Sequence, residues 1–335
     1  MIKYIIIIAY VIFLYSCSIE SDKTPVIKTE QLKENKNPQE KKEFNFSRDK
    51  LKTNTKKTSI DIKLVLDGGP GKDGIPAINK PNFLSISEAK SYMKYLTDDE
   101  TGIAVSLDGI SRFYPFSILV WHEIVNDVIG ENKFAVTFCP LCGSSIVFDR
   151  VVNGEELYFG VSGKLYELNM LMYDNKTETL WSQSLGKAVV GDMLGIQLEN
   201  IRGNVLSFSD FISNFPDGKV LSDKTGFSRN YGVIPYGNYD KSDLLYFPIQ
   251  NTDASFHKKE MFYIVNHSGF SIAFNLKDLV KEETASLQIG DKVYNAIYNK
   301  GLIEVNFEGE SIPGYYEMWF SFITHNMGNK NIWSK

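Results

Sequence analysis

Three parts of the chain differ in their pattern of hydrophobic and polar positions. Residues 5–14 form an apolar run, residues 18–59 are dominated by Lys, Glu, Asn, Gln and Thr, and apolar and polar positions alternate from about residue 61 onward. The apolar run has the length of a signal-peptide core and is shorter than the roughly 20 residues that span a bilayer. The polar part holds too few apolar residues to offset the entropy of ordering it. We therefore predict, in chain order, a signal peptide, a disordered tether and a single globular domain: 1–16, 17–60 and 61–335.

A cysteine follows the apolar run directly, in the order Leu14-Tyr15-Ser16-Cys17. This order resembles the lipobox of bacterial lipoproteins, in which the cysteine is lipidated and becomes the first residue of the mature chain. The resemblance implies an extracytoplasmic protein that partners a bacterial membrane through acyl chains on Cys17. It would then face the periplasm or the cell surface, most simply at the outer membrane. The alternative is an uncleaved signal anchor in which Cys17 has no role.

The globular part contains a repeated pattern. Residues from about 103 to 163 align with residues from about 263 to 325 when the sequence is shifted along itself. Identities between the copies fall at Val105, Gly109, Ser111, Leu119, Val120, Glu123, Ile129 and Gly130. The segment 157–240 lies between the copies. This self-similarity predicts two related halves of one domain.

Both copies show the same order of expected elements. In the first copy an alternating strand, Ala104 to Leu107, reaches the hairpin signal Asp108-Gly109, and a second strand leaves it. Pro115 is suited to precede a helix, which we predict over 116–125 and expect to be buried because it is apolar nearly all round. A strand at 133–138 follows. The fold class is therefore predicted as α+β and strand-rich, with two β-hairpin/helix/strand halves around a shared core.

The copies differ at the residues that could carry chemistry. The first copy continues with Cys139-Pro140-Leu141-Cys142-Gly143, whereas the second has Asn299-Lys300-Gly301-Leu302 at the first four of these positions. His122 likewise aligns with Glu282. A scaffold present twice, with cysteines and histidine in one copy, indicates an added function; sequence drift in the second copy is the alternative.

The C-x-x-C pair allows three interpretations. A metal knuckle is favoured by the Cys-Pro-x-Cys-Gly turn, although a structural zinc site needs four ligands and no second pair is present. A redox-active dithiol is the second interpretation, without the helix that follows such pairs in thioredoxin-like sites. The third is a structural disulfide formed in an oxidising compartment.

Histidines would complete a metal site. His122 is the first candidate because it lies in an apolar segment, and His325, near the end of the second copy, is the second. Two thiolates with one or two imidazoles suit zinc or copper, and sulfur favours Cu(I). The other two histidines, His257 and His267, are expected in solvent.

Further candidates are polar side chains near these residues. Glu123 and Asp149 are the nearest carboxylates in sequence, and either could orient a histidine or act as a general base. Arg229, in a Gly- and Tyr-rich stretch, could bind a carboxylate or phosphate. Trp121 and Trp181 are expected in the core or in a pocket wall. We therefore treat Glu123, Asp149 and Arg229 as the candidate catalytic residues.

The net charge argues against nucleic acid as a partner. The chain has 36 Lys and Arg against 41 Asp and Glu, a formal charge of −5, and nucleic-acid binding requires a basic surface. The common nucleotide-binding and hydrolase signatures are absent from the sequence.

Several sequence blocks together resemble one bacterial family, the domain of unknown function 3179. The blocks are Trp121 to Asp127, Thr137 to Ser144, Phe159 to Gly163, Leu171 to Asp174, Leu180 to Gln183, Thr225 to Gly232 with Pro235-Tyr236, and Trp319 to His325. The resemblance runs from about Asp73 to about Asn326, where family members tend to have proline. It implies that His122, Cys139, Cys142, Trp181 and Arg229 occupy recurring positions.

Our leading hypothesis is a lipid-anchored extracytoplasmic domain that holds zinc or copper through Cys139, Cys142, His122 and His325, for metal handling or metal-dependent chemistry. The first alternative is a thiol–disulfide oxidoreductase that uses Cys139 and Cys142. The second is a non-enzymatic surface scaffold in which these cysteines form a structural disulfide.

Overall fold

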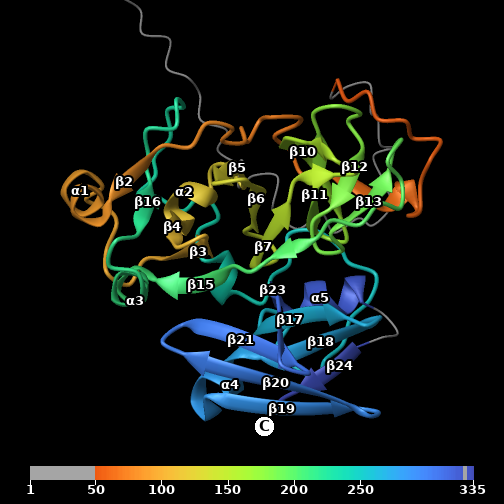
Figure 1. Cartoon of the computed structure of the whole chain (residues 1–335). Helices are drawn as coiled ribbons and strands as arrows, with labels where there is room; N and C mark the ends of the chain where they lie inside the picture. Colours follow the sequence, from red (N-terminus) through yellow and green to blue (C-terminus); the bar gives the residue numbers. More distant parts are fainter. Residues whose placement is uncertain (1–49, 327–329) are drawn as a thin grey trace, which may run out of the picture.

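The computed structural model describes residues 50–326 and 330–335 (Figure 1). The predicted signal peptide and Cys17 lie outside the described residues. The folded body begins earlier than residue 61, because Leu51 and Thr53 are already buried and the Thr53 hydroxyl donates to the carbonyl of Glu178 at 2.6 Å. None of the helices in the described part of the chain is both long and apolar enough to cross a bilayer.

The two copies have the same elements at the same relative positions. In the first copy these are β3 (Thr101–Leu107), β4 (Ile110–Pro115), α2 (Phe116–Leu119), β5 (Ile124–Ile129), β6 (Asn132–Cys139) and β7 (Ser144–Asp149). In the second copy they are β17 (Met261–His267), β18 (Phe270–Asn275), α4 (Leu276–Glu282), β19 (Thr284–Ile289), β20 (Lys292–Asn299) and β21 (Leu302–Phe307). A shift of the numbering by 160 therefore superposes the bounds of both hairpins and the starts of both helices.

The copies share one sheet, here called the central sheet, whose strand order is β24-β18-β17-β23-β7-β6-β5, with β14 paired to β7. The strands that are new here are β14 (Asn200–Ile201), β23 (Tyr315–Met318) and β24 (Lys330–Trp333). The sheet thus combines the last three strands of the first copy with the first hairpin of the second. β23 joins them, because it pairs with β17 on one side and with β7, at Tyr316 and Ser145, on the other.

Three further sheets surround the central sheet (Figure 1). One has the order β15-β3-β4-β16-β2, and its new elements are β2 (Phe83–Ser85), α1 (Ile86–Tyr92), β15 (Asn204–Ser207), α3 (Phe208–Asn214) and β16 (Lys219–Leu221). The second has the order β1-β10-β11-β12-β13 and consists of β1 (Val65–Asp67), β10 (Phe159–Tyr166), β11 (Asn169–Asp174), β12 (Leu180–Ser182) and β13 (Lys187–Val190). The third combines β19, β20 and β21 with β22 (Glu310–Ile312) in the lower body, where α5 (Trp319–His325) also lies.

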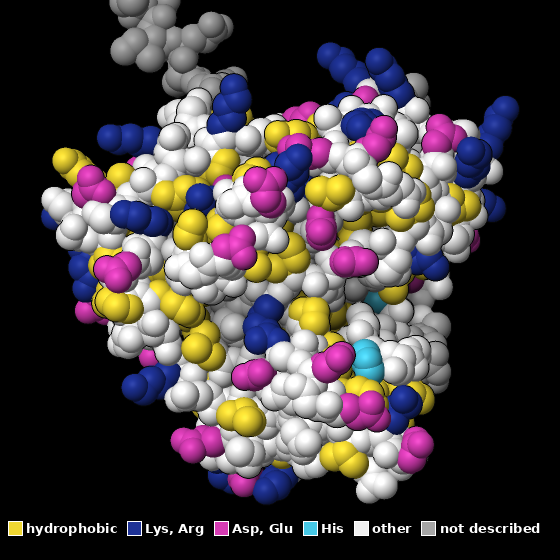
Figure 2. Space-filling model, viewed as in Figure 1, with side chains coloured by type: hydrophobic (Ala, Val, Ile, Leu, Met, Phe, Trp, Pro, Cys, Tyr) yellow, Lys and Arg dark blue, Asp and Glu magenta, His cyan; other side chains and the backbone are white. Residues whose placement is uncertain are grey.

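This architecture confirms the predicted strand-rich α+β class, with 42% of the residues in strands and 13% in helices. Short elements complete it: a two-stranded ribbon, β8 (Val151–Val152) and β9 (Glu155–Glu156), and two 3₁₀ turns, η3 (Ile62–Leu64) and η4 (Tyr239–Lys241). On the face shown in Figure 2, Lys and Arg side chains are interspersed with Asp and Glu, so neither charge covers a continuous area.

The predicted helix over 116–125 is wrong in its length. It begins at Phe116 as expected, but α2 ends at Leu119 and β5 begins at Ile124. Glu123 adopts a left-handed backbone with φ of 57°, which stops the helix. The β-branched residues that follow pair with β6, where their branched side chains pack well. His122 consequently lies in a tight turn.

The second copy has a residue with the same left-handed backbone conformation, and this residue allows a test of backbone strain. Glu283 ends α4 with φ of 60° and an exposed side chain. Because glycine adopts this conformation without steric cost, we expect Glu283→Gly to raise the free energy of unfolding by about 1 kcal/mol. Urea denaturation measures the change. Lys277→Gly, inside the same helix, is the control and should lose about 1 kcal/mol; a loss in both variants would contradict the prediction.

Candidate functional site

Cys139 and Cys142 lie at the two ends of a tight turn between β6 and β7. The amide of Cys142 donates to the carbonyl of Cys139 at 3.1 Å, which closes a four-residue turn. Gly143 follows with φ of 57°, a conformation that suits glycine. Such a turn holds the two Cα atoms within about 7 Å of each other, close to the 4.4–6.8 Å that a disulfide spans. Both cysteines are free thiols, 2% and 0% exposed.

The end of the second copy and the segment between the copies hold this turn in place. The amide of Met318, at the end of β23, donates to the carbonyl of Cys142 at 2.9 Å, and the Tyr239 hydroxyl donates to the carbonyl of Leu141 at 2.9 Å. A Cβ atom on Gly143 would lie 3.0 Å from the sulfur of Met261. The turn is therefore fixed on several sides, and its glycine is required for packing as well as for the backbone angle.

The two thiols have different electrostatic surroundings. Burial alone would raise the pKa of Cys139, but a hydrogen bond from the Cys142 thiol and backbone N–H groups of Met170, Cys142 and Leu141 favour its thiolate, and the pKa falls below its ordinary value. Burial and the neighbouring Cys139 sulfur raise the pKa of Cys142 well above normal. The carbonyl of Leu168, 3.3 Å from the Cys142 sulfur, is a second acceptor for the same S–H group. The surroundings thus favour the thiolate at Cys139 and the thiol at Cys142.

A buried carboxyl group interacts electrostatically with each thiol. Burial, and then the charge of Cys139, raise the pKa of Glu123 well above its usual range, while a hydrogen bond with Tyr236 lowers it. Glu317 on β23 interacts with Cys142 in the same way. Burial raises the pKa of Glu317 to about 7, although Ser321 donates to its Oε1 at 2.5 Å.

Two hydrogen bonds fix the His122 ring. Its Nδ1 donates to the carbonyl of Pro76 at 2.7 Å, and its Nε2 accepts from the Tyr231 hydroxyl at 2.8 Å. Tyr231 is in turn 2.6 Å from the hydroxyl of Thr225. Burial lowers the pKa of His122 to about 4, which keeps the ring neutral. Both ring nitrogens are therefore occupied by the protein itself.

His325 lies at the end of α5, and its Nδ1 donates to the carbonyl of Ser321 at 2.9 Å. Within residues 50–326 and 330–335, no group of three or more His, Cys, Asp and Glu side chains is arranged to hold a metal ion. The structure therefore brings Cys139 and Cys142 together but does not add His122 or His325 to them. The four-ligand zinc or copper site stays a prediction.

The structure places some of the remaining candidate residues far from the cysteine turn and others close to it. Asp149 lies at the far end of β7, about 17 Å along the strand from Ser144, where its carboxylate accepts from the amide of Val151 at 2.7 Å. His257 is solvated, as expected, and its ring lies 2.7 Å from Asp243. Glu123 and Arg229, in contrast, both line one pocket.

This pocket has a volume of about 540 Å³ and adjoins the turn. Its wall includes Glu123, Leu141 and Met170, which are also neighbours of Cys139. Lys164 of β10 and Tyr236 line it as well. The dithiol and the pocket therefore share a wall.

Sequence reasoning missed Lys164, Tyr236 and Glu317. Lys164 is 1% exposed because a β-bulge shifts the register of β10 between Val161 and Lys164, so the alternating pattern gives no signal for its burial. Glu317 follows two buried tyrosines in a four-residue strand buried along its whole length. The only feature of the sequence that could have indicated a buried carboxyl group here is a charged residue within an otherwise apolar run.

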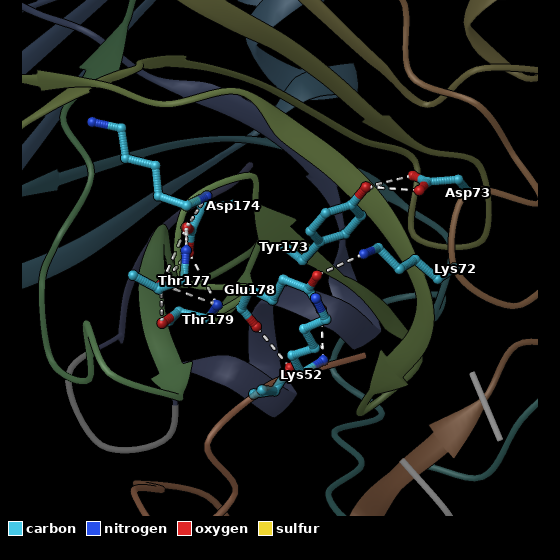
Figure 3. A network of polar contacts seen from close by, with 10 residues as sticks. Lys52, Lys72, Asp73, Tyr173, Asp174, Thr177, Glu178 and Thr179 are labelled. Atoms are coloured by element: carbon cyan, nitrogen blue, oxygen red, sulfur yellow. Dashed lines mark hydrogen bonds and ion pairs between the residues drawn. The ribbon is translucent and has the colours of Figure 1, made fainter. Parts of the chain in front are cut away.

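A polar network surrounds Trp181, one of the residues that the motif resemblance singled out. The Asp174 carboxylate accepts from the amides of Thr177 and Thr179, at 2.6 and 3.0 Å, and from the Trp181 indole at 3.1 Å. Figure 3 shows Asp174 turned toward the two threonines at the tip between β11 and β12. Trp181 is fully buried, so this aspartate and tryptophan fix the hairpin.

The same hairpin anchors the beginning of the folded body. Glu178 pairs with Lys72 at 2.9 Å and accepts from the amide of Lys52, while the Tyr173 hydroxyl donates to Asp73 at 2.7 Å (Figure 3). None of these five residues lines the pocket. We assign this network to structure.

His122 should contribute mainly to stability. We expect His122→Ala to lower the free energy of unfolding by about 2–4 kcal/mol, because it removes two buried hydrogen bonds and leaves a cavity. Tyr231→Phe, which removes one bond, should cost about 1 kcal/mol. Denaturant titration measures both. His257→Ala is the exposed control; a His122 variant as stable as that control would refute the structural role.

Glu317 should make stability depend on pH in a defined direction. Its pKa is about 7 in the folded chain against a reference of 4.5, so the folded state keeps a proton that the unfolded state releases. The free energy of unfolding should therefore fall, by about 3 kcal/mol relative to Glu317→Gln, as pH rises from 4.5 to 7, and then level off. Denaturation at several pH values tests this.

The control for that series is Glu310→Gln, which removes an exposed carboxyl from β22. Its stability should follow the same pH dependence as the unmodified protein. A Glu317→Gln curve parallel to both would show that Glu317 ionises normally in the folded chain.

Comparison with known proteins gives one match. The model of a family described as protein of unknown function (DUF3179) matches residues 72–327, which include β2 to α5 and therefore both copies and most of the pocket wall. Neither the curated proteins nor the solved structures contain a match to the chain. Because the family model covers well over half of the sequence and agrees with the resemblance of its motifs, the chain belongs to the DUF3179 family.

Proposed function

We propose that this protein is a thiol–disulfide oxidoreductase in which Cys139 attacks and Cys142 resolves. The observation that carries the proposal is the four-residue turn between β6 and β7, which has a free thiol at each end and shifts the pKa values of the two thiols in opposite directions. A stabilised thiolate beside a protonated thiol is the arrangement that thiol–disulfide exchange requires.

The reaction would proceed in two steps. The Cys139 thiolate attacks one sulfur of a substrate disulfide; a mixed disulfide forms, and the other substrate sulfur leaves with the electron pair as a thiolate. Cys142 then loses its proton and attacks the Cys139 sulfur, so the second substrate thiolate leaves. Two electrons pass from the cysteine pair to the substrate disulfide, and a Cys139–Cys142 disulfide remains.

Access is controlled by the protein around the pair. Cys142 is fully buried and Cys139 nearly so. Glu123, Leu141 and Met170 line the pocket and are neighbours of Cys139, so a substrate would approach from the pocket side. An attacking sulfur whose neighbours line the pocket and a fully buried resolving sulfur fit the roles given above.

The expected cell compartment is consistent with this chemistry. Disulfides persist outside the cytoplasm, and we propose that acyl chains on Cys17 anchor the protein there. The experiment below also distinguishes this proposal from the other two hypotheses, a metal site and a structural disulfide.

The test uses the full-length protein equilibrated in defined mixtures of reduced and oxidised glutathione. Mass spectrometry should show a reversible two-electron conversion of the Cys139–Cys142 pair. Cys142→Ser should accumulate one glutathione on Cys139, because the resolving thiol is missing. Cys139→Ser should accumulate much less, because the pKa of Cys142 is raised and its sulfur is buried.

Three results would overturn the proposal. A pair that never closes to a disulfide contradicts it directly. A disulfide that strong reductants alone can open indicates the scaffold hypothesis. One equivalent of zinc or copper in the reduced protein, lost in Cys139→Ser, indicates the metal hypothesis. Ser91→Ala, at an exposed position of α1, is the control and should behave like the unmodified protein.

A further inference from the structure

The pocket beside the cysteine turn has features of a ligand site that do not depend on thiol chemistry. Its volume of about 540 Å³ lies within the range of small-molecule sites. It forms where chain segments far apart in sequence meet: the loop after β1, the turn after α2, the strand pair β10 and β11, and the segment 229–247. Such a junction is a usual place for a binding site.

Most of the pocket wall is apolar. Aromatic side chains from Trp121, Tyr236, Tyr246 and Phe247 are joined by aliphatic ones such as Ile75. Burial of an apolar body against these side chains would supply most of the binding free energy, because it removes apolar surface from water. The wall therefore favours a ligand with an aromatic or bulky aliphatic body.

The segment that forms one side of the pocket is held by hydrogen bonds. The Trp121 indole donates to the carbonyl of Val233 at 3.1 Å, and the Tyr246 hydroxyl donates to the carbonyl of Tyr236 at 3.2 Å. The Arg229 guanidinium donates to the carbonyl of Ser228 at 2.9 Å. The pocket wall is thus ordered before a ligand arrives, which lowers the entropic cost of binding.

The charges that line the pocket do not cancel. Lys164 and Asp67 form an ion pair at 3.5 Å. Glu123 is buried, and this burial raises its pKa, which favours the neutral carboxyl. Arg229 lines the same pocket, and across residues 50–326 and 330–335 it forms no salt bridge. One positive charge is therefore left to face the ligand.

We propose that this pocket binds a small organic anion, whose apolar body contacts the aromatic wall and whose carboxylate or sulfonate group pairs with Arg229. Guanidinium groups bind such anions through two parallel hydrogen bonds. The carboxyl of Glu123 and the hydroxyl of Tyr236 supply polar contacts at the side of the pocket that faces Cys139. The inference goes beyond the proposed redox function and does not require it.

The experiment uses two fluorescent probes that differ in one charged group. 8-Anilino-1-naphthalenesulfonate carries a sulfonate, and N-phenyl-1-naphthylamine has the same rings without it. In fluorescence titrations of the full-length protein, the sulfonate probe should bind at one site per chain and about tenfold more tightly than the neutral probe.

Variants of the protein assign that difference to the pocket. Arg229→Gln should weaken binding of the sulfonate probe about tenfold and leave the neutral probe unchanged. Lys241→Gln removes an exposed positive charge from the same segment, outside the pocket wall, and should change neither. Ile75→Trp fills the pocket and should weaken the binding of both probes. If circular dichroism shows that this variant is misfolded, Ile75→Phe is used in its place.

Any of three findings would overturn the inference: equal affinity for the two probes, an Arg229→Gln variant that behaves like Lys241→Gln, or unchanged binding after the pocket is filled. The readout is independent of the cysteines. Repeating the titration with Cys139→Ser therefore separates a failure of the ligand site from a failure of the redox function.

Discussion

The position of the cysteine turn depends on the insertion of one short strand, β23, between β17 and β7. This strand joins the two copies into the central sheet, and its last residue donates the backbone hydrogen bond that holds the carbonyl of Cys142. It also carries Glu317, the carboxyl group beside that cysteine. A site built on the first copy is thus completed by residues near the end of the second. Neither copy contains the site alone.

The two copies show how one backbone can serve different purposes. Glu123, in the turn after α2, and Glu283, which caps α4, have nearly the same φ, and the carbonyl of each accepts a hydrogen bond at 2.8 Å, from the amides of Phe138 and Tyr298 respectively. Yet Glu123 is 6% exposed, whereas Glu283 is in solvent. The difference arises from what packs on the scaffold, because the loop after β1 and the segment 229–247 cover the first copy.

Local patterns in the sequence predicted the hairpins well, because Asp108-Gly109 and the alternating strands are short-range signals. They did not predict where α2 ends, since an apolar run from Phe116 to Val125 is compatible with a buried helix or with a strand, and pairing with β6 decides between them. The direction of the His122 ring depends on Pro76 and Tyr231, which come from distant parts of the chain. Lys164 reaches the pocket because of a β-bulge, and Tyr236 because of a long irregular segment. Neither feature can be predicted from the neighbouring sequence. The cysteine pair was found because its spacing is itself local.

The late position of β23 also has a kinetic consequence. Its pairing with β7 joins residues about 170 positions apart, Ser145 and Tyr316, and contacts between such distant residues form slowly during folding. A chain that emerges from its N-terminus completes the cysteine hairpin long before the strand that covers it. Until β23 pairs, both sulfurs are therefore open to oxidants and to thiols of other proteins. Correct folding then requires the central sheet to be completed before Cys139 or Cys142 forms a disulfide with another thiol.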